Sequence, residues 1–317
     1  MKLVKNTLAL TICSIIALPT FAADVDVYGR ADVSVQSSDA GEGSFTEVKS
    51  NASRIGLKGT HKLNDDLEVV YKAEFQVDLD GDSAKGDSIT DRSQYVGLKG
   101  GFGEVLLGKN DTMLKQSQGK VDLFSDLNGD IKNLWKGENR MADTISYKSP
   151  KFSDISVGVT YIAEDAVDAE DAISVAVFYG DKNLKKSKIY AAVAMDSEVK
   201  GYDTTRATVQ GKVAGVTLGA IYHTQEKSVD GSAEMDGFLV SAKYKIDKVT
   251  LKGQYQTADY DGGDSKSGVT VGADYSLAKS TKLYAFYTSF DMDTGADEDY
   301  LAAGIPVSYT HLRAHET

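Results

Sequence analysis

The chain has 317 residues, with 35 Lys and Arg against 47 Asp and Glu, and its formal net charge is -12. Only 3 prolines occur and apolar residues make up 41%, which excludes collagen-like and disordered chains. Beyond the first two dozen residues no apolar run approaches the roughly 18 residues that a membrane-spanning helix needs, so helical membrane proteins are excluded as well. The acidic balance argues against nucleic acid as a partner, because phosphate binding rests on clustered Lys and Arg.

Residues 1–22 have the pattern of a secretory signal peptide. Lys2 and Lys5 precede an apolar run, and a small residue, Ala22, stands at the expected cleavage point. Cys13 lies in the middle of the apolar run rather than at its end, so a lipid-modified cysteine is not expected. We therefore expect export and removal of residues 1–22.

The rest of the chain alternates between apolar and polar residues. In residues 67–78 the apolar side chains include Leu67 and Val69, and the polar parity includes Lys72 and Glu74. A period of two over this length predicts a strand with one apolar and one polar face. The same pattern gives sixteen candidate strands, at residues 25–37, 53–62, 67–78, 92–100, 103–110, 144–150, 154–163, 172–181, 187–195, 203–213, 216–225, 236–246, 249–258, 267–277, 281–290 and 298–305.

The connections between these strands alternate between short, mostly basic turns and longer, acidic loops. This difference is typical of a barrel whose two mouths face different compartments, with short periplasmic turns and long outer loops. A closed barrel also pairs every strand edge, which a hydrocarbon environment demands. We therefore predict an all-β protein over residues 23–305, a transmembrane antiparallel β-barrel of 16 strands with the apolar parity toward lipid. Aromatic girdles are expected from Tyr71, Phe75, Tyr147, Tyr161, Tyr179, Tyr244, Tyr275 and Phe290.

The third long loop, residues 111–143, is longer than any other connection and holds the only tryptophan, Trp135. A connection of this length is usually functional or disordered. Its many apolar residues indicate that it packs against something, so we predict that it folds into the lumen and presents Asp122, Asp126 and Asp130 to the pore. A packed outer loop that covers a neighbouring subunit is the alternative.

Several segments carry a resemblance to a known family. VDVYGR at 25–30, SRIGLKGTHKL at 53–63 and RSQYVGLKGGFGEVLLGKND at 92–111 are followed by the long connection after the fifth strand. In this order they resemble the general porins of Gram-negative bacteria, the trimeric sixteen-stranded type, over residues 23–305. The resemblance implies a homotrimer in the outer membrane of a Gram-negative bacterium.

The resemblance also implies that the third loop opposes basic residues on the barrel wall. Arg54, Arg92 and Arg140 match the places where such porins carry wall arginines, and Arg30 matches a basic position in the first strand. The alternation independently points Arg30 into the lumen, because it shares parity with Asp32. The Pro-Glu-Phe-Gly-Gly turn that many members carry in the third loop is absent here.

Such a channel works passively, since opposed acids and bases at a constriction orient water and polar solutes while the pore width limits their size. We expect an outer-membrane porin for small hydrophilic solutes and ions with a weak cation preference, bordered by lipid and lipopolysaccharide. A receptor or adhesin barrel that binds a partner through its acidic loops is the alternative. The four histidines belong to no nucleophile or metal motif, so neither an enzyme nor a cofactor or metal is expected.

The end of the chain departs from this pattern. Pro306 cannot donate a ladder hydrogen bond, and the sequence PVSYTHLRAHET neither alternates clearly nor ends on an aromatic residue. We expect residues 306–317 to be an anomalous tail that originates from a cloning or sequencing artefact and packs poorly.

Overall fold

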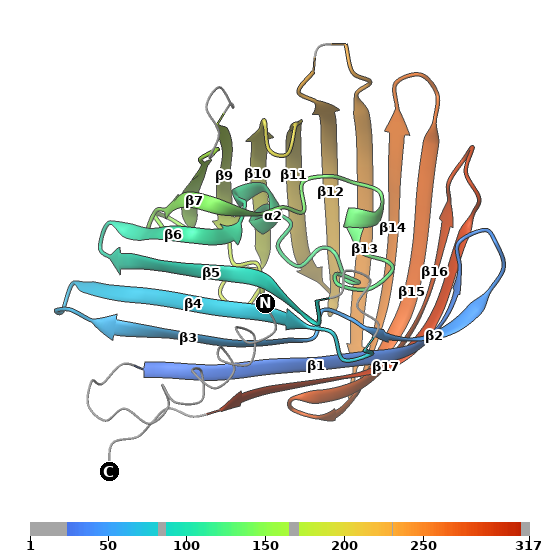
Figure 1. Cartoon of the computed structure of the whole chain (residues 1–317), viewed down its shortest axis with the longest axis horizontal. Coiled ribbons are helices and arrows are strands. Elements are labelled where there is room, and N and C mark those ends of the chain that lie inside the picture. Colours follow the sequence, from blue (N-terminus) through green and yellow to red (C-terminus); the bar gives the residue numbers. More distant parts are fainter. Residues whose placement is uncertain (1–23, 82–86, 165–170, 230, 312–317) are drawn as a thin grey trace.

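The computed structural model describes residues 24–81, 87–164, 171–229 and 231–311, so the expected signal peptide at 1–22 lies outside the described residues. Nearly all of the described chain is β-structure (Figure 1). The strands are β1 (Asp24–Asp39), β2 (Phe45–Ser50), β3 (Arg54–Lys62), β4 (Leu67–Val77), β5 (Ile89–Gly100), β6 (Gly103–Asp111), β7 (Arg140–Lys148), β8 (Ile155–Ile162), β9 (Ala172–Gly180), β10 (Ile189–Ser197), β11 (Tyr202–Val213), β12 (Val216–Lys227), β13 (Met235–Ile246), β14 (Val249–Tyr260), β15 (Ser265–Ala278), β16 (Thr281–Asp291) and β17 (Glu298–His311).

The strands form one antiparallel sheet that closes on itself. From β3 onward each strand pairs with the next, and β17 pairs with β1 over Val27 to Asp39. Both β2 and β3 pair with β1, β3 along its first half and β2 along its second half. These two strands therefore make a single crossing, and the predicted closed barrel of sixteen strands is confirmed.

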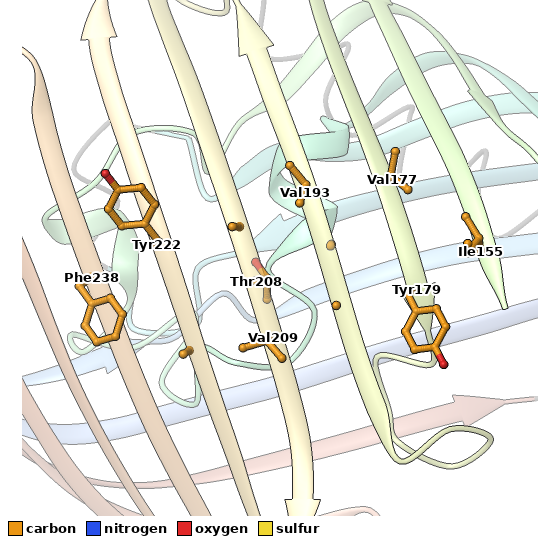
Figure 2. A pocket seen from close by; sticks show the side chains of 12 residues that line it. Ile155, Val177, Tyr179, Val193, Thr208, Val209, Tyr222 and Phe238 are labelled. Atoms are coloured by element: carbon orange, nitrogen blue, oxygen red, sulfur yellow. The ribbon is translucent and has the colours of Figure 1, made fainter.

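Alternation along each strand separates the two faces of the wall. In β8, Val157 and Val159 are exposed on the outer face, whereas Ser156 and Thr160 are buried on the inner face. Figure 2 shows the outer face of β8 to β13, where valines lie beside Tyr179, Tyr222 and Phe238 in a shallow apolar hollow. This apolar surface suits lipid because hydrocarbon neither donates nor accepts hydrogen bonds.

One expected girdle residue lies on the wrong face. Phe290 is 1% exposed on the inner side of β16, where it packs with Trp135 and Leu239, whereas Tyr179 and Tyr244 are 45% and 43% exposed on the outer side. Its neighbours on the same parity, including Phe286, are also buried. The prediction for Phe290 is therefore wrong, because its position near a strand end was used without its parity.

The barrel does not stop at residue 305 as expected. β17 continues to His311, and Pro306 lies opposite Asp32 of β1. Val307 and Tyr309 are 36% and 45% exposed and share the outer parity of Ile305, so the apolar outer face extends past the proline. The expected boundary is corrected to His311, because pairing with β1 accommodates the proline where β16 offers no partner to it.

The connection between β6 and β7 contains the short helix α2 (Met113–Ser117) and the 3-10 turn η1 (Ile131–Asn133). We call residues 112–139 the β6–β7 segment. Among the described residues, no helix has the length and apolar character to cross a membrane.

Candidate functional site

The β6–β7 segment begins by packing on the inner face of β8 to β11 (Figure 1). Thr112 caps α2 by accepting a hydrogen bond from the backbone N–H of Lys115 at 3.2 Å. The N–H of Leu114 donates to Ser174 Oγ at 3.0 Å, and the Tyr190 hydroxyl donates to the carbonyl of Ser117 at 3.0 Å. Met113 and Leu114 are buried against the inner side chains of β9 and β10, which secures the helix to the wall by apolar contact.

The middle of the segment rests on glycines of the wall. Val121 lies over Gly219 and Trp135 over Gly237, where an added Cβ would come within 2.7 Å and 2.6 Å of these side chains. The indole N–H of Trp135 donates to the carbonyl of Thr257 at 2.7 Å. Glycine is needed at both positions because the wall side chain would otherwise occupy the space of the segment.

A buried ion pair holds the end of the segment. Arg206 of β11 is fully buried and donates to Glu138 Oε1 at 2.6 Å. His223 of β12 accepts from Arg206 Nε at 3.3 Å and stacks on Trp135 with ring centroids 4.8 Å apart. Burial raises the pKa of Glu138 even though Arg206 acts in the opposite direction. If this ion pair broke, a buried charge would be left without a partner at a large cost in free energy, so the pair fixes the end of the segment to β11.

Arg30 and Arg54 lie opposite each other in the pairing of β1 with β3. Asp126 of the segment lies 3.5 Å from Arg30 Nη1 and 3.5 Å from Arg54 Nη2, measured from its Oδ2. Arg30 also forms an ion pair with Asp32, which is buried on the same strand. Of the three acids predicted for this side, Asp126 is the one that reaches the wall arginines.

Arg92 belongs to a second cluster on the neighbouring strands. Its Nε donates to Glu74 Oε1 at 2.9 Å, and its Nη1 donates to Gln76 Oε1 at 3.1 Å. Lys72 lies 3.2 Å from Glu74 Oε2, and the Tyr28 hydroxyl donates to the same oxygen at 2.7 Å. Glu74 therefore places a negative charge among the basic residues of the wall, which reduces the positive electrostatic potential near Arg92 and Lys72.

Arg140 stands apart from the other predicted arginines. It begins β7 opposite Asp111 of β6, and its Nε lies 3.0 Å from Asp111 Oδ1. Lys115 of α2 lies 3.5 Å from the same oxygen. These contacts place Arg140 where the β6–β7 segment leaves and rejoins the wall, and it ties together the two strands that bear the segment.

Asp122 and Asp130 serve the fold of the segment. Asp122 accepts from the N–H of Phe124 at 2.9 Å and of Ile131 at 3.4 Å, and Asp130 accepts from the N–H of Asp126 at 2.8 Å. Asp130 also caps η1 by accepting from Lys132 N–H at 2.9 Å. Burial and the nearby Asp130 raise the pKa of Asp122 well above its usual range. The three acids thus divide their tasks between the loop and the wall.

Sequence reasoning missed Glu74, Asp32 and Lys72 as members of the charged wall. The signal was present, since all three lie on the polar parity of their strands beside residues that were selected. What alternation cannot give is which of the polar side chains on neighbouring strands meet. No group of three or more His, Cys, Asp or Glu residues suited to hold a metal occurs among the described residues.

Comparisons with known proteins agree with this architecture. The chain is 26% identical to the major outer membrane protein P.IB of Neisseria meningitidis serogroup B over 314 residues, which cover 87% of this chain and 90% of that protein. The anion-selective porin from Comamonas acidovorans shares the fold with a TM-score of 0.78 and 20% identity, covering 90% of this chain and 100% of that one. The trimer form of OmpT from Vibrio cholerae matches with a TM-score of 0.70 and 18% identity, covering 92% and 100%. The family profile described as Gram-negative porin matches residues 9–295, and the chain therefore belongs to this family of outer-membrane proteins.

Proposed function

We propose that this porin is a water-filled channel through which small hydrophilic solutes and ions diffuse passively across the outer membrane. The β6–β7 segment narrows the lumen, and the gap between this segment and the wall arginines sets the size limit. The observation that carries the proposal is the distance of 3.5 Å from Asp126 to each of Arg30 and Arg54. Asp126 belongs to the β6–β7 segment, whose end is anchored to β11 by the hydrogen bond between Arg206 and Glu138.

Opposed charges at that point create a transverse field. Arg30 and Arg54 supply the positive side and Asp126 the negative side, so a passing solute with a dipole is turned as it enters. Water in the gap is ordered in the same direction. Strong binding is not required, since it would slow the release of the solute.

The charges at the two levels of the pore act in opposite directions on ions. Acidic outer loops concentrate cations at the mouth, within a screening length of about 8 Å at physiological salt, while Arg54 and Arg92 repel cations further in. We propose a weak cation preference that decreases as salt rises. This differs from the anion selectivity stated for the Comamonas acidovorans porin, so the sign of the preference is a direct test.

The test is the reversal potential and single-channel conductance of the reconstituted protein in a planar bilayer under a salt gradient. The double variant Arg54→Ala and Arg92→Ala is expected to strengthen cation preference and to raise conductance, because two bulky cations leave the narrowest region. Lys99→Ala is the control, since Lys99 pairs with Glu68 near a strand end and is 51% exposed. An unchanged reversal potential and conductance in the double variant would show that these arginines do not border the ion path.

We also propose that the protein is a homotrimer whose acidic outer loops lie against lipopolysaccharide. The trimer form of the OmpT structure supports the oligomeric state, and the apolar outer face offers a surface that a neighbouring subunit can cover. Light scattering of the detergent complex gives the subunit number. A monomeric mass in several mild detergents would contradict the trimer.

A further inference from the structure

Four lysines border a cavity of about 270 Å³ at the end of the barrel that carries the short turns. Lys120 comes from the β6–β7 segment, Lys182 from the turn between β9 and β10, Lys212 from β11 and Lys243 from β13. No acidic side chain borders this cavity, and within the described part of the chain none of the four lysines forms an ion pair. The cavity is therefore a concentration of positive charge without a counter-ion from the protein.

The register of the sheet explains how the lysines gather. Lys212 pairs with Thr217, Thr217 with Lys243, and Lys243 with Lys252, so these residues form one row across β11 to β14 on the inner face. Asp274 of β15 lies 3.0 Å from Lys252 and 2.6 Å from a lysine of β16. That acid is already shared by two other cations and does not border the cavity that Lys212 and Lys243 line.

The β6–β7 segment lies over this row and fixes the fourth lysine. Gln210 Nε2 donates to the carbonyl of Lys120 at 3.4 Å, and Ser241 Oγ donates to the carbonyl of Val121 at 2.6 Å. Gln210 and Ser241 lie two residues before Lys212 and Lys243 on the same inner face, so these contacts hold the backbone of the segment next to the two lysines. These two hydrogen bonds between the segment and the wall therefore place Lys120 at the cavity.

Two further observations point to an anionic ligand. Gln210 borders the cavity, is 3% exposed, and its Oε1 has no hydrogen-bond partner in the described residues, so this oxygen can accept a hydrogen bond from the hydroxyl of a hydrogen phosphate. Burial and the nearby charges of Lys182 and Lys243 lower the pKa of the Lys120 ammonium. Like charges that crowd in this way are relieved when an anion binds between them.

We propose that this cavity is an oxyanion-binding subsite that holds phosphate, free or as part of a small phosphate ester. Lysine ammonium groups donate in three directions to a compact anion, and the Gln210 amide and Thr217 hydroxyl add neutral hydrogen bonds. The ligand is a solute of the lumen, because the side chains that border the cavity lie on the inner face of the wall. The subsite is separate from the Arg30, Arg54 and Asp126 contact.

The test is the equilibrium binding of inorganic phosphate to the full-length protein, refolded in detergent without lipopolysaccharide, by calorimetry. Lys212→Gln with Lys243→Gln is expected to weaken binding at least about ten-fold, because hydrogen bonds to charged groups are the strong ones. Lys212→Arg with Lys243→Arg is expected to keep binding within about three-fold, since charge and donors remain. Lys185→Gln with Lys248→Gln removes the same charge from exposed turn positions that do not border the cavity, and is expected to bind like the parent.

Circular dichroism first establishes that each variant has the barrel spectrum of the parent. No measurable phosphate binding by the parent, or equal weakening in the cavity variant and the turn variant, would overturn the proposal. Equal binding by the parent and by the cavity variant would do the same. Because no membrane is needed, the result is independent of whether the protein conducts ions.

Discussion

Asp126 occupies the position in the segment where the chain turns with a positive φ of 69°. Non-glycine residues adopt this conformation at a cost, and Asp tolerates it better than most. The turn directs the carboxylate toward Arg30 and Arg54, whereas Asp122 and Asp130 face the backbone of the segment. One residue of the segment therefore carries the negative side of the proposed constriction.

Asp126→Asn tests that assignment. The change removes the charge between two arginines and keeps the shape of the side chain, so we expect the reversal potential to shift toward anions by several millivolts under a ten-fold salt gradient. Asp261→Asn is a matched control, since Asp261 is exposed in the loop between β14 and β15 and is screened by solvent. Equal shifts in the two variants would remove Asp126 from the ion path.

Asp122 gives a prediction for pH. Burial raises its pKa in the folded protein above that of the unfolded chain, so folding favours the protonated form. Its contribution to the free energy of unfolding is then fully present below the unfolded pKa of about 3.9, and it is lost as the pH rises through the folded pKa.

Asp122→Asn removes this titration while it keeps one acceptor for the N–H of Phe124 or Ile131. We expect the thermal midpoint of the variant to depend less on pH between 4 and 8 than that of the parent, as measured by circular dichroism. Glu104→Gln, in β6 where Glu104 lies opposite Lys99 and Lys148 of the neighbouring strands, is the control for removal of a carboxylate. Parallel pH curves for the parent and Asp122→Asn would contradict the assignment.

At the scale of elements, the period of two predicted the strands well. It failed at a short strand with no fully buried face. β2 reads FTEVKS, and half of its side chains are exposed and the other half only partly buried. It pairs with the half of β1 beyond the residues that pair with β3, and its Lys49 donates to Asn128 of the β6–β7 segment at 3.3 Å. β5 and β7 also begin earlier than predicted, at Ile89 and Arg140, because their first residues, ITD and RMAD, do not alternate regularly between apolar and polar.

The β6–β7 segment could be predicted only in part. Its apolar composition indicated packing, and the resemblance to porins supplied the wall arginines, but no periodicity links Trp135 to Gly237 or Glu138 to Arg206. Those contacts join residues far apart in the chain through the register of the barrel. Such pairs depend on the register between strands around the closed sheet, which the alternation along each strand does not give.

Gly237→Val tests the support beneath the segment. A Cβ at this position would lie 2.6 Å from the Trp135 indole, so the ring must move from its stack with His223. We expect a noisier open channel and a conductance at least about 20% different from the parent, with tryptophan fluorescence shifted to longer wavelength as the ring loses its burial. Gly253→Val is the control, because an added Cβ there meets no atom within 4 Å.

At the scale of the whole molecule, the barrel depends on the last described strand. Residues 306–311 pair with Val27 to Asp32 of β1, so they complete the seam even though Pro306 interrupts the ladder toward β16. Their expected origin as a cloning or sequencing artefact is a separate matter that stays a prediction. A seam left open would expose unpaired strand edges.

Truncation after Ile305 therefore should lower the yield of folded barrel in refolding at least about five-fold, because six residues of β1 lose the strand with which they pair. Truncation after His311 keeps every described pair and is expected to refold like the full chain. The folded fraction is measured by the shift in electrophoretic migration between unheated and heated samples. Equal yields for the two truncations would show that residues 306–311 do not contribute to closure.

The pairing of β1 with β17 also determines when the barrel can close during folding. It joins Val27 to His311, near opposite ends of the chain, and contacts of such long sequence separation form slowly because loop closure costs entropy before it is rewarded. As long as the last strand is missing, the sheet has two unpaired edge strands, and no part of it is closed. Until its two ends meet, every copy of the chain has unpaired strand edges, so pairing between copies competes with closure and increases with the concentration of the protein.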